Sequence, residues 1–221
     1  MPPRNELSSS DQVRNLEQLV TAARRAGVDD PRVLEAMRRV PRAGYVPLDQ
    51  VGSAYRDEPV QIPHGQVTTQ PSLSACMVQA LRLAGTEHVL EVGTGYGYQT
   101  ALLAHLASFV TSIERWPDLA EMARRHLIAQ GIRNVRVVDG DGTEGVPLGA
   151  PYDAIVVSAA FPEVPEPLVN QLRIAGRLVQ PIGPGGAERV TAFERTLHGL
   201  VSLEVVSHAR FVRLYGRHGY E

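Results

Sequence analysis

The sequence predicts a single α/β domain whose central sheet is mostly parallel and carries helices on both faces. Three observations lead to this prediction. From residue 88 onward, short apolar runs alternate with amphipathic helical patterns, which is typical of parallel strands joined by crossover helices. A glycine-rich turn follows the first apolar run, as in sheets that bind ligands at the carboxyl ends of their strands. The length of 221 residues fits one domain with a substantial core.

The N-terminal part of the chain is expected to be helical. Residues 1–15 are expected to be flexible, and two short helices are predicted over Leu16–Ala26 and Pro31–Val40. Gly27 suits the end of the first helix, and Asp30 suits the N-cap of the second.

Residues 40–70 lose all periodicity before a third helix, which is predicted over Pro71–Leu83. A loop of this length is unusual in a compact domain and is often functional. Prolines interrupt the pattern throughout this region, at Pro41, Pro47, Pro59, Pro63 and Pro71.

The alternating part of the chain predicts five strands and three helices. The strands are expected at His88–Val92, Val110–Ile113, Val135–Val138, Ala154–Val157 and Arg177–Pro181. The helices are expected at Gln99–Ala107, Leu119–Gln130 and Pro167–Ile174. Two further segments, Val190–Arg195 and Ser202–Leu214, lack helical periodicity and are predicted to close the sheet as antiparallel strands. The chain thus divides into residues 16–83, a core over residues 84–185, and C-terminal strands over residues 186–221.

The composition argues against several function classes. With 43% apolar residues, 21% charged residues and a formal net charge of −2, the chain has no field that would gather nucleic acid or an acidic membrane. No apolar run approaches the ~20 residues that span a bilayer. Cys76 is the only cysteine, and no zinc-ligand spacing occurs among the histidines. We therefore expect a cytoplasmic monomer without a metal site.

The turn Gly93-Thr94-Gly95-Tyr96-Gly97-Tyr98 is the strongest candidate for a ligand site. Taken alone, it is equally compatible with a tight turn that binds nothing. Three acidic residues, Glu91, Glu114 and Asp141, lie at the ends of successive predicted strands. A carboxylate after the second strand can accept both hydroxyls of a ribose, and one after the third can accept from an adenine amino group. Together they predict a nucleoside crevice.

The spacing within the turn separates the candidate nucleosides. A dinucleotide turn reads G-x-G-x-x-G, but counting from Gly93 the third position is Tyr98. A phosphate loop with Lys followed by Ser or Thr is also missing. S-adenosylmethionine has no phosphate and carries positive charge, which suits an acid-rich crevice. The sequence therefore favours S-adenosylmethionine as the cofactor.

Beyond this turn, the residues resemble the protein-L-isoaspartate O-methyltransferase family. The similarity runs from about Leu16 to Leu214. It is carried by Asp30–Met37, Val40-Pro41-Arg42, Tyr45-Val46-Pro47, Ala54-Tyr55 with Asp57, Gly65-Gln66 with Gln70-Pro71, Val89–Gly95, Ser112–Arg115, Gly140-Asp141-Gly142 and Ala150–Asp153. The motifs around the turn are common to many methyltransferases, whereas the irregular stretch from Val40 to Pro71 is more specific to this family.

This resemblance implies a Rossmann-like methyltransferase fold with N-terminal helices and C-terminal β additions. It implies a carboxyl methyltransferase that acts on L-isoaspartyl, and also D-aspartyl, residues of damaged proteins or peptides and leaves S-adenosyl-L-homocysteine. Gly65–Pro71 would form the reaction centre, with Thr69 in the position of the family's active-site serine. The cofactor-binding residues implied are Thr68, Gln70, Glu91, Gly93, Thr94, Gly95, Tyr98, Gln99, Glu114, Arg115, Asp141, Gly142 and Ser158.

Two departures from the family pattern leave alternatives open. Thr69 stands where the family has serine, and Arg213 stands where the family tends to have proline. One alternative is a related O-methyltransferase that acts on a carboxylate of a modified peptide or a small molecule. A non-catalytic cofactor-binding protein and a nucleotide-dependent oxidoreductase are the other two.

Overall fold

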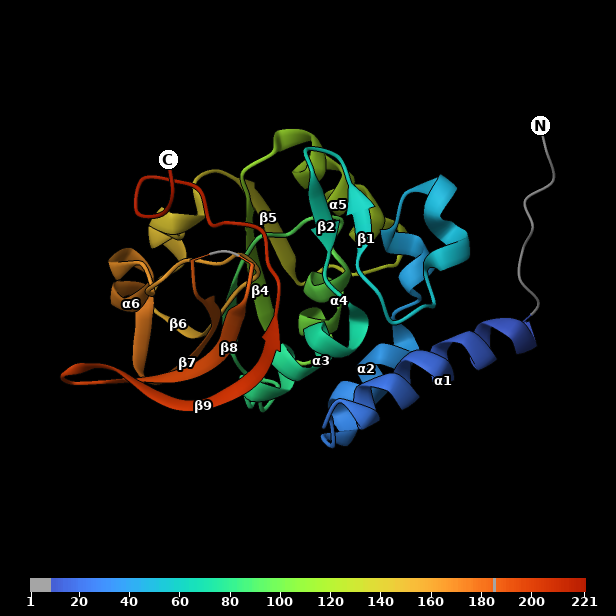
Figure 1. The fold of residues 1–221 in the computed structure, drawn as a ribbon, viewed down its shortest axis with the longest axis horizontal. Helices are drawn as coiled ribbons and strands as arrows, with labels where there is room; N and C mark the ends of the chain where they lie inside the picture. The colour runs from blue at the N-terminus through green and yellow to red at the C-terminus, as the bar shows by residue number, and fades with distance from the viewer. Residues whose placement is uncertain (1–8, 185) are drawn as a thin grey trace.

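The structure of the protein is a computed structural model, and it describes residues 9–184 and 186–221 (Figure 1). A seven-stranded sheet forms its centre, in the order β5-β4-β3-β6-β7-β8-β9. The strands are β3 (His88–Val92), β4 (Phe109–Glu114), β5 (Val135–Asp139), β6 (Tyr152–Val157), β7 (Leu172–Ile182), β8 (Glu188–Thr196) and β9 (Gly199–Ala209). The first five run parallel, and β8 and β9 add antiparallel pairs at one edge. This confirms the predicted fold class.

Apolar side chains alternate between the two faces of each central strand, as the period of two requires. On one face Val89, Val110 and Val156 pack in a cluster with α1 (Ser9–Arg25), α2 (Pro31–Arg39), α3 (Pro71–Ala80) and α4 (Tyr98–Ala104). On the other face Leu90 and Ile155 pack with α6 (Glu166–Gln171). The sheet is therefore covered on both sides. In Figure 1, α1 and α2 lie at the side of the molecule away from the β8–β9 turn.

The order of the strands places a crevice at the carboxyl end of β3. From β3 the chain proceeds outward through β4 to β5, and then returns to the other side of β3 as β6 and β7. Helix α4 joins β3 to β4, and α5 (Pro117–Ala129) joins β4 to β5. Ligands in open α/β sheets bind where the strand order reverses in this way.

The segment from Val40 to Gln70, which was expected to lack structure of its own, contains two short 3₁₀ helices and a hairpin. These are η1 (Arg42–Tyr45), η2 (Leu48–Ser53), β1 (Val60–Ile62) and β2 (Gln66–Thr68). His64 and Gly65 occupy the turn with φ of 62° and 65°, the conformation of a type I′ turn, which matches the twist of a hairpin. The prediction of an irregular loop was therefore wrong for these residues, because strands of three residues are too short to show alternation.

Three boundaries also differ from the prediction. Helix α1 begins at Ser9, seven residues before the predicted start at Leu16, whereas residues 1–8 of the segment expected to be flexible lie outside the described part of the chain. The helix predicted over Pro167–Ile174 ends at Gln171, and β7 begins at Leu172, whose partner on β6 is Tyr152. The last predicted strand ends at Ala209. Strand pairing decides the start of β7 at Leu172 and the end of β9 at Ala209, and it leaves little trace in the local pattern.

Within residues 9–184 and 186–221, no helix combines the length and apolar character that a membrane span requires.

Candidate active site

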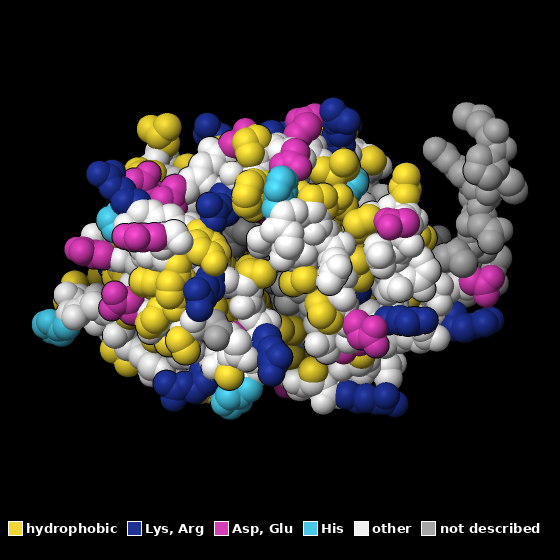
Figure 2. Space-filling view, turned by 45° about the horizontal axis from the view of Figure 1, so that its top comes forward, with side chains coloured by type: hydrophobic (Ala, Val, Ile, Leu, Met, Phe, Trp, Pro, Cys, Tyr) yellow, Lys and Arg dark blue, Asp and Glu magenta, His cyan; other side chains and the backbone are white. Residues whose placement is uncertain are grey.

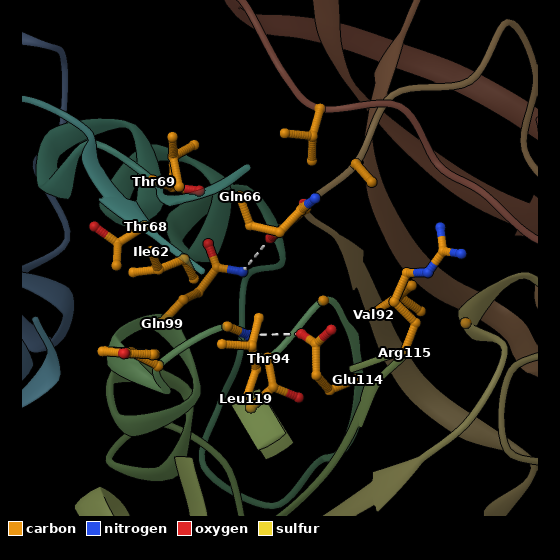
Figure 3. A pocket seen from close by; sticks show the side chains of 18 of the residues that line it. Ile62, Gln66, Thr68, Thr69, Val92, Thr94, Gln99, Glu114, Arg115 and Leu119 are labelled. Atoms are coloured by element: carbon orange, nitrogen blue, oxygen red, sulfur yellow. Dashed lines mark hydrogen bonds between the residues drawn. The ribbon is translucent and has the colours of Figure 1, made fainter. Parts of the chain in front are cut away.

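A pocket lined by the glycine turn, called the main pocket below, lies at the carboxyl ends of the central strands (Figure 3). Its floor comes from the turn between β3 and α4, from the end of β4, and from single residues after β5 and β6. The β1–β2 hairpin covers one side, and residues 212–215 of the C-terminal segment cover another. The predicted residues that line it are Thr68, Thr69, Gly93, Thr94, Gly95, Tyr98, Gln99, Glu114, Arg115, Gly142 and Ser158.

The glycine turn is built so that its backbone borders the pocket. Gly93, Gly95 and Gly97 have φ of 94°, 54° and 93°, values that a residue with a side chain adopts only with strain. The Gly95 N–H donates to Oε2 of Glu114 at 2.9 Å, and the Trp116 N–H donates to Oε1 at 3.1 Å. These two bonds leave lone pairs of the carboxylate free, because each oxygen can accept twice. Figure 3 shows Glu114 facing the turn across the pocket.

Glu91, by contrast, does not line the main pocket. Its side chain is completely buried and accepts hydrogen bonds from Thr100 Oγ1, Ser112 Oγ and Gln99 Nε2. Gln99 also donates to Ser158 Oγ at 2.9 Å, and both Gln99 and Ser158 line the pocket. Glu91 therefore acts from behind the pocket wall, by holding Gln99 in place.

The stability of the protein is expected to depend on pH through Glu91. Burial raises the pKa of this carboxyl to about 7, although its three hydrogen bonds lower it. Between the unperturbed pKa of 4.5 and about 7, the folded chain binds more protons here than the unfolded chain. The stabilising contribution is thus complete below pH 4.5 and is lost as the pH rises to 7. Glu91→Gln should remove this loss, which amounts to roughly 1–3 kcal/mol.

Urea unfolding of Glu91→Gln and the parent chain at pH 5 and pH 7.5 measures this effect. The variant should lose less stability than the parent between the two pH values. Glu163→Gln is a matched control, because Glu163 is exposed and its carboxylate makes no hydrogen bond within the described residues. Equal losses in Glu91→Gln and the parent would contradict the assignment.

Asp141 also lies outside the lining of the main pocket. Its Oδ1 accepts from the backbone N–H and the hydroxyl of Thr143, and its Oδ2 accepts from the Arg217 N–H at 2.7 Å. Burial raises the pKa of Asp141, but these hydrogen bonds lower it by more, so the pKa lies below the ordinary value of an aspartate. The carboxylate thus ties the C-terminal segment to the loop after β5. Its neighbour Gly142 lines the pocket in close contact with Val92.

Three buried polar atoms of residues that line the main pocket have no hydrogen-bond partner in the part of the chain that the structure describes. They are the Gln99 Oε1, the Ser74 Oγ and the Tyr98 hydroxyl. An unpaired buried polar group costs about 1–3 kcal/mol, so a ligand that pairs with it binds more tightly. The pocket thus fits a ligand of three parts. The unused acceptors suit an ammonium, the Glu114 carboxylate suits ribose hydroxyls, and the apolar walls from Ile113 and Leu119 suit a flat base.

A buried arginine holds the loop that carries Thr68 and Thr69. The guanidinium of Arg42, which is fully buried, donates to the backbone carbonyls of Ala54, Arg56, Glu58 and Thr69 and to Thr68 Oγ1. Burial lowers the pKa of Arg42 to about 10, so it stays charged at neutral pH. Within the described chain the Thr69 hydroxyl has no hydrogen-bond partner. Thr69 therefore offers a free hydroxyl on a fixed backbone.

Gln70 is the third predicted residue that the main pocket does not include. Its Nε2 donates to Asp57 Oδ2 at 2.9 Å and to Ser72 Oγ, and the Ser72 N–H donates to Asp57 Oδ1. These bonds fix the start of α3 directly after Thr69. Gln70 lines a different cavity, described next.

This second groove meets the main pocket at a shared wall. It runs between α3 and residues 207–212, with Leu73, Cys76 and Phe211 among its lining residues. The residues that line both cavities are Val67, Thr69, Ser158 and Val212. Thr69 thus stands between two cavities, which a reaction that joins two substrates requires.

Sequence reasoning missed the lining residues that come from the hairpin and the C-terminal segment. Ile62 belongs to the hairpin, whose two three-residue strands carry no readable alternation. Gln66 and Val67 lie within the expected reaction centre Gly65–Pro71, but no individual role was assigned to them. Val212–Tyr215 reach the pocket because residue 213 pairs with Ala160. No local signal predicts a contact between residues so far apart in the chain. Arg213 was noted only as a departure from the family pattern, and it lines the main pocket.

Within the described ranges, no cluster of three or more His, Cys, Asp or Glu side chains is placed to hold a metal ion.

Comparison with known proteins gives consistent matches over nearly the whole chain. The model of the family described as protein-L-isoaspartate(D-aspartate) O-methyltransferase matches residues 14–219. A protein-L-isoaspartate O-methyltransferase of Methanoculleus marisnigri is 45% identical over 209 residues, which is 94% of either chain. Protein-L-isoaspartate O-methyltransferase 1 of Rhodopseudomonas palustris is 49% identical over 195 residues, which is 88% of this chain and 80% of the relative.

Solved structures show the same similarity. One structure, described as a protein-L-isoaspartate O-methyltransferase, superposes with a TM-score of 0.79 at 30% sequence identity. The superposed part is 92% of this chain and 67% of the other chain. A second, from Plasmodium falciparum and described in complex with S-adenosyl-L-homocysteine, gives a TM-score of 0.77 at 24% identity and covers 91% of this chain and 98% of its own.

Proposed function

The chain belongs to the protein-L-isoaspartate(D-aspartate) O-methyltransferase family, and from this premise we propose which residues carry each part of the reaction. The activity is the transfer of a methyl group from S-adenosylmethionine to the free carboxylate of an isoaspartyl residue in a damaged protein. The main pocket holds the methyl donor, and the second groove holds the acceptor chain. Thr69 orients the acceptor carboxylate at the wall between them.

The shared wall is the observation that carries this proposal. Val67, Thr69, Ser158 and Val212 line both cavities, so the two substrates approach each other at these residues. Among their side chains, those of Thr69 and Ser158 are polar. Ser158 already accepts from Gln99, whereas the Thr69 hydroxyl is free within the described residues. Accepting from Gln99 leaves the Ser158 proton unused, so both hydroxyls can donate. We assign the acceptor to Thr69 because it stands in the position of the family's active-site serine.

The donor is held by the turn at residues 93–99 and by Glu114. The Glu114 carboxylate binds the ribose hydroxyls, and the unused Oε1 of Gln99 accepts from the donor's ammonium. Because Asp141 is engaged with Thr143 and the Arg217 N–H, the base is bound by the apolar walls and by Gly142. Thr94, Tyr98 and Arg115 complete the pocket, while Glu91 and Gln70 support it from behind.

The main task of the side chains in this reaction is to orient the acceptor carboxylate toward the methyl group. A carboxylate acceptor with a pKa of about 4 is ionised at neutral pH and needs no general base. S-adenosylmethionine supplies a methyl group on a positively charged sulfur and leaves as S-adenosyl-L-homocysteine, while the acceptor becomes a methyl ester. Thr69 donates one hydrogen bond that fixes the direction of the attacking oxygen. Such positioning contributes several kcal/mol to catalysis.

A methyl-transfer assay tests the proposal directly. The purified chain is incubated with donor labelled in its methyl group and a peptide that contains one isoaspartyl residue. We expect label in this peptide and almost none in its twin with normal aspartate. Labelled methanol should be released as the ester hydrolyses, which identifies a carboxyl acceptor. Equal labelling of the two peptides, or labelling of neither, would overturn the proposal.

Three further properties are part of the proposal. The net charge of −2 favours peptide and protein acceptors over nucleic acid. A cytoplasmic location is part of the proposal, and the single cysteine of the chain fits a reducing compartment. Each chain contains both cavities and their shared wall, so the monomer has all the parts of the site.

A further inference from the structure

The second groove carries positive charge that the methyl transfer itself does not use. The chain contains 22 cationic side chains, all of them arginines. Two exposed residues of the groove, His208 and Arg210, are basic, and none of its lining residues is acidic. Figure 2 shows several arginines around the hollow in the middle of this face of the molecule.

Arg213 places a second positive charge on the other side of the shared wall. Val212 belongs to both cavities, Arg210 precedes it on the groove side, and Arg213 follows it on the side of the main pocket. Arg213 is exposed and its guanidinium lies 4.9 Å from the centre of the Tyr220 ring. Within the described residues, neither Arg210 nor Arg213 forms an ion pair or a side-chain hydrogen bond.

Two acidic side chains of this region are already engaged in hydrogen bonds. Asp57 accepts from the Ser72 N–H and from Gln70, and it is not among the lining residues of the groove. Glu188, which pairs with Ala209 of β9 across the sheet, is buried and accepts from the N–H groups of Ala187 and Phe211. Among residues 9–184 and 186–221, neither arginine therefore has a carboxylate partner.

We propose that Arg210 and Arg213 select isoaspartyl sites that have an acidic residue beside the reactive one. This inference rests on the proposed function, because it takes the second groove as the path of the acceptor chain. When the reacting carboxylate stands at the wall beside Thr69, the neighbouring residues lie along the groove past Arg210 or toward Arg213. An aspartate or glutamate there pairs with a guanidinium that otherwise faces solvent.

The expected effect follows from the exposure of both arginines. Exposed ion pairs contribute about 0.2–1 kcal/mol, so each arginine should favour an acidic neighbour by up to about five-fold in kcat/KM. The preference should shrink as salt is added, since exposed charges are screened over about 10 Å at 0.1 M salt.

The experiment compares isoaspartyl peptides that differ only in the residue on either side of the isoaspartate, which is Glu, Gln or Lys. The values of kcat/KM are measured at low and high salt for the parent chain, Arg210→Gln and Arg213→Gln. We expect the order Glu, Gln, Lys in the parent, and a smaller Glu-to-Lys ratio in each variant. Arg133→Gln is the matched control, because Arg133 is exposed and lines neither cavity.

The outcomes separate this inference from the proposed function. Methylation of none of the peptides would refute the function. Methylation with equal kcat/KM for Glu, Gln and Lys would leave the function intact and overturn the inference. If Arg210→Gln and Arg213→Gln lower kcat/KM equally for all peptides, the arginines are structural and the inference is wrong. Thermal unfolding of each variant confirms that the fold is retained.

Discussion

Replacing Thr69 with valine is expected to lower kcat/KM for an isoaspartyl peptide by about 10- to 100-fold while donor affinity stays unchanged. Valine has nearly the shape of threonine but lacks the hydroxyl, so the acceptor carboxylate loses one charge-assisted hydrogen bond. Hydrogen bonds to charged groups contribute about 1.5–3 kcal/mol, which gives this range. Arg42 holds the loop through the Thr69 carbonyl, which the substitution leaves in place. Steady-state kinetics gives kcat/KM, and calorimetry with S-adenosyl-L-homocysteine gives the donor affinity.

Thr69→Ser is the matched control for this prediction. Serine keeps the hydroxyl and removes the methyl group that restricts rotation about χ1. We therefore expect Thr69→Ser to retain activity within a few-fold of the parent. A Thr69→Val enzyme as active as the parent would contradict the assigned role. A loss in Thr69→Ser equal to that in Thr69→Val would point to packing rather than to the hydroxyl.

Replacing Glu114 with alanine is expected to weaken donor binding on the order of 100-fold, from the loss of about two charged hydrogen bonds to the ribose. Glu114 is 5% exposed and also accepts from the N–H groups of Gly95 and Trp116. The glycine turn therefore loses a support together with the ligand contact. Calorimetric titration with S-adenosyl-L-homocysteine measures the change in Kd.

Two further variants separate charge from support in this prediction. Glu114→Gln keeps an acceptor for the Gly95 N–H but loses the negative charge, and it should bind the donor with intermediate affinity. Glu121→Ala removes an exposed carboxylate of α5, which pairs with Arg125 outside the main pocket, and should bind like the parent. Parent-like affinity in Glu114→Ala would refute the assignment of Glu114 to the ribose.

The local sequence predicted the central sheet and its glycine turn well because both depend on short-range rules. Buried strands need runs of apolar residues, and a turn with positive φ at Gly93 and Gly95 needs glycine. The three acids show where such rules stop. All three lie at or just after the ends of predicted strands, yet of these three Glu114 alone lines the main pocket. The presence of an acidic residue at the end of a strand does not reveal whether its carboxylate oxygens face a ligand or hydrogen-bond donors of the protein itself.

The sequence by itself determined the fold class, the position of the glycine turn and the family, because each depends on patterns among residues that are neighbours in the chain. The tertiary structure alone decided that Glu91 and Asp141 support the pocket rather than line it, since their partners Thr100, Ser112 and Arg217 meet them only after folding. It also decided that Thr69 stands at a wall between two cavities. That wall also includes Val212, which no local pattern connects to Thr69, because the two residues lie far apart in the chain and are brought to one place only by folding.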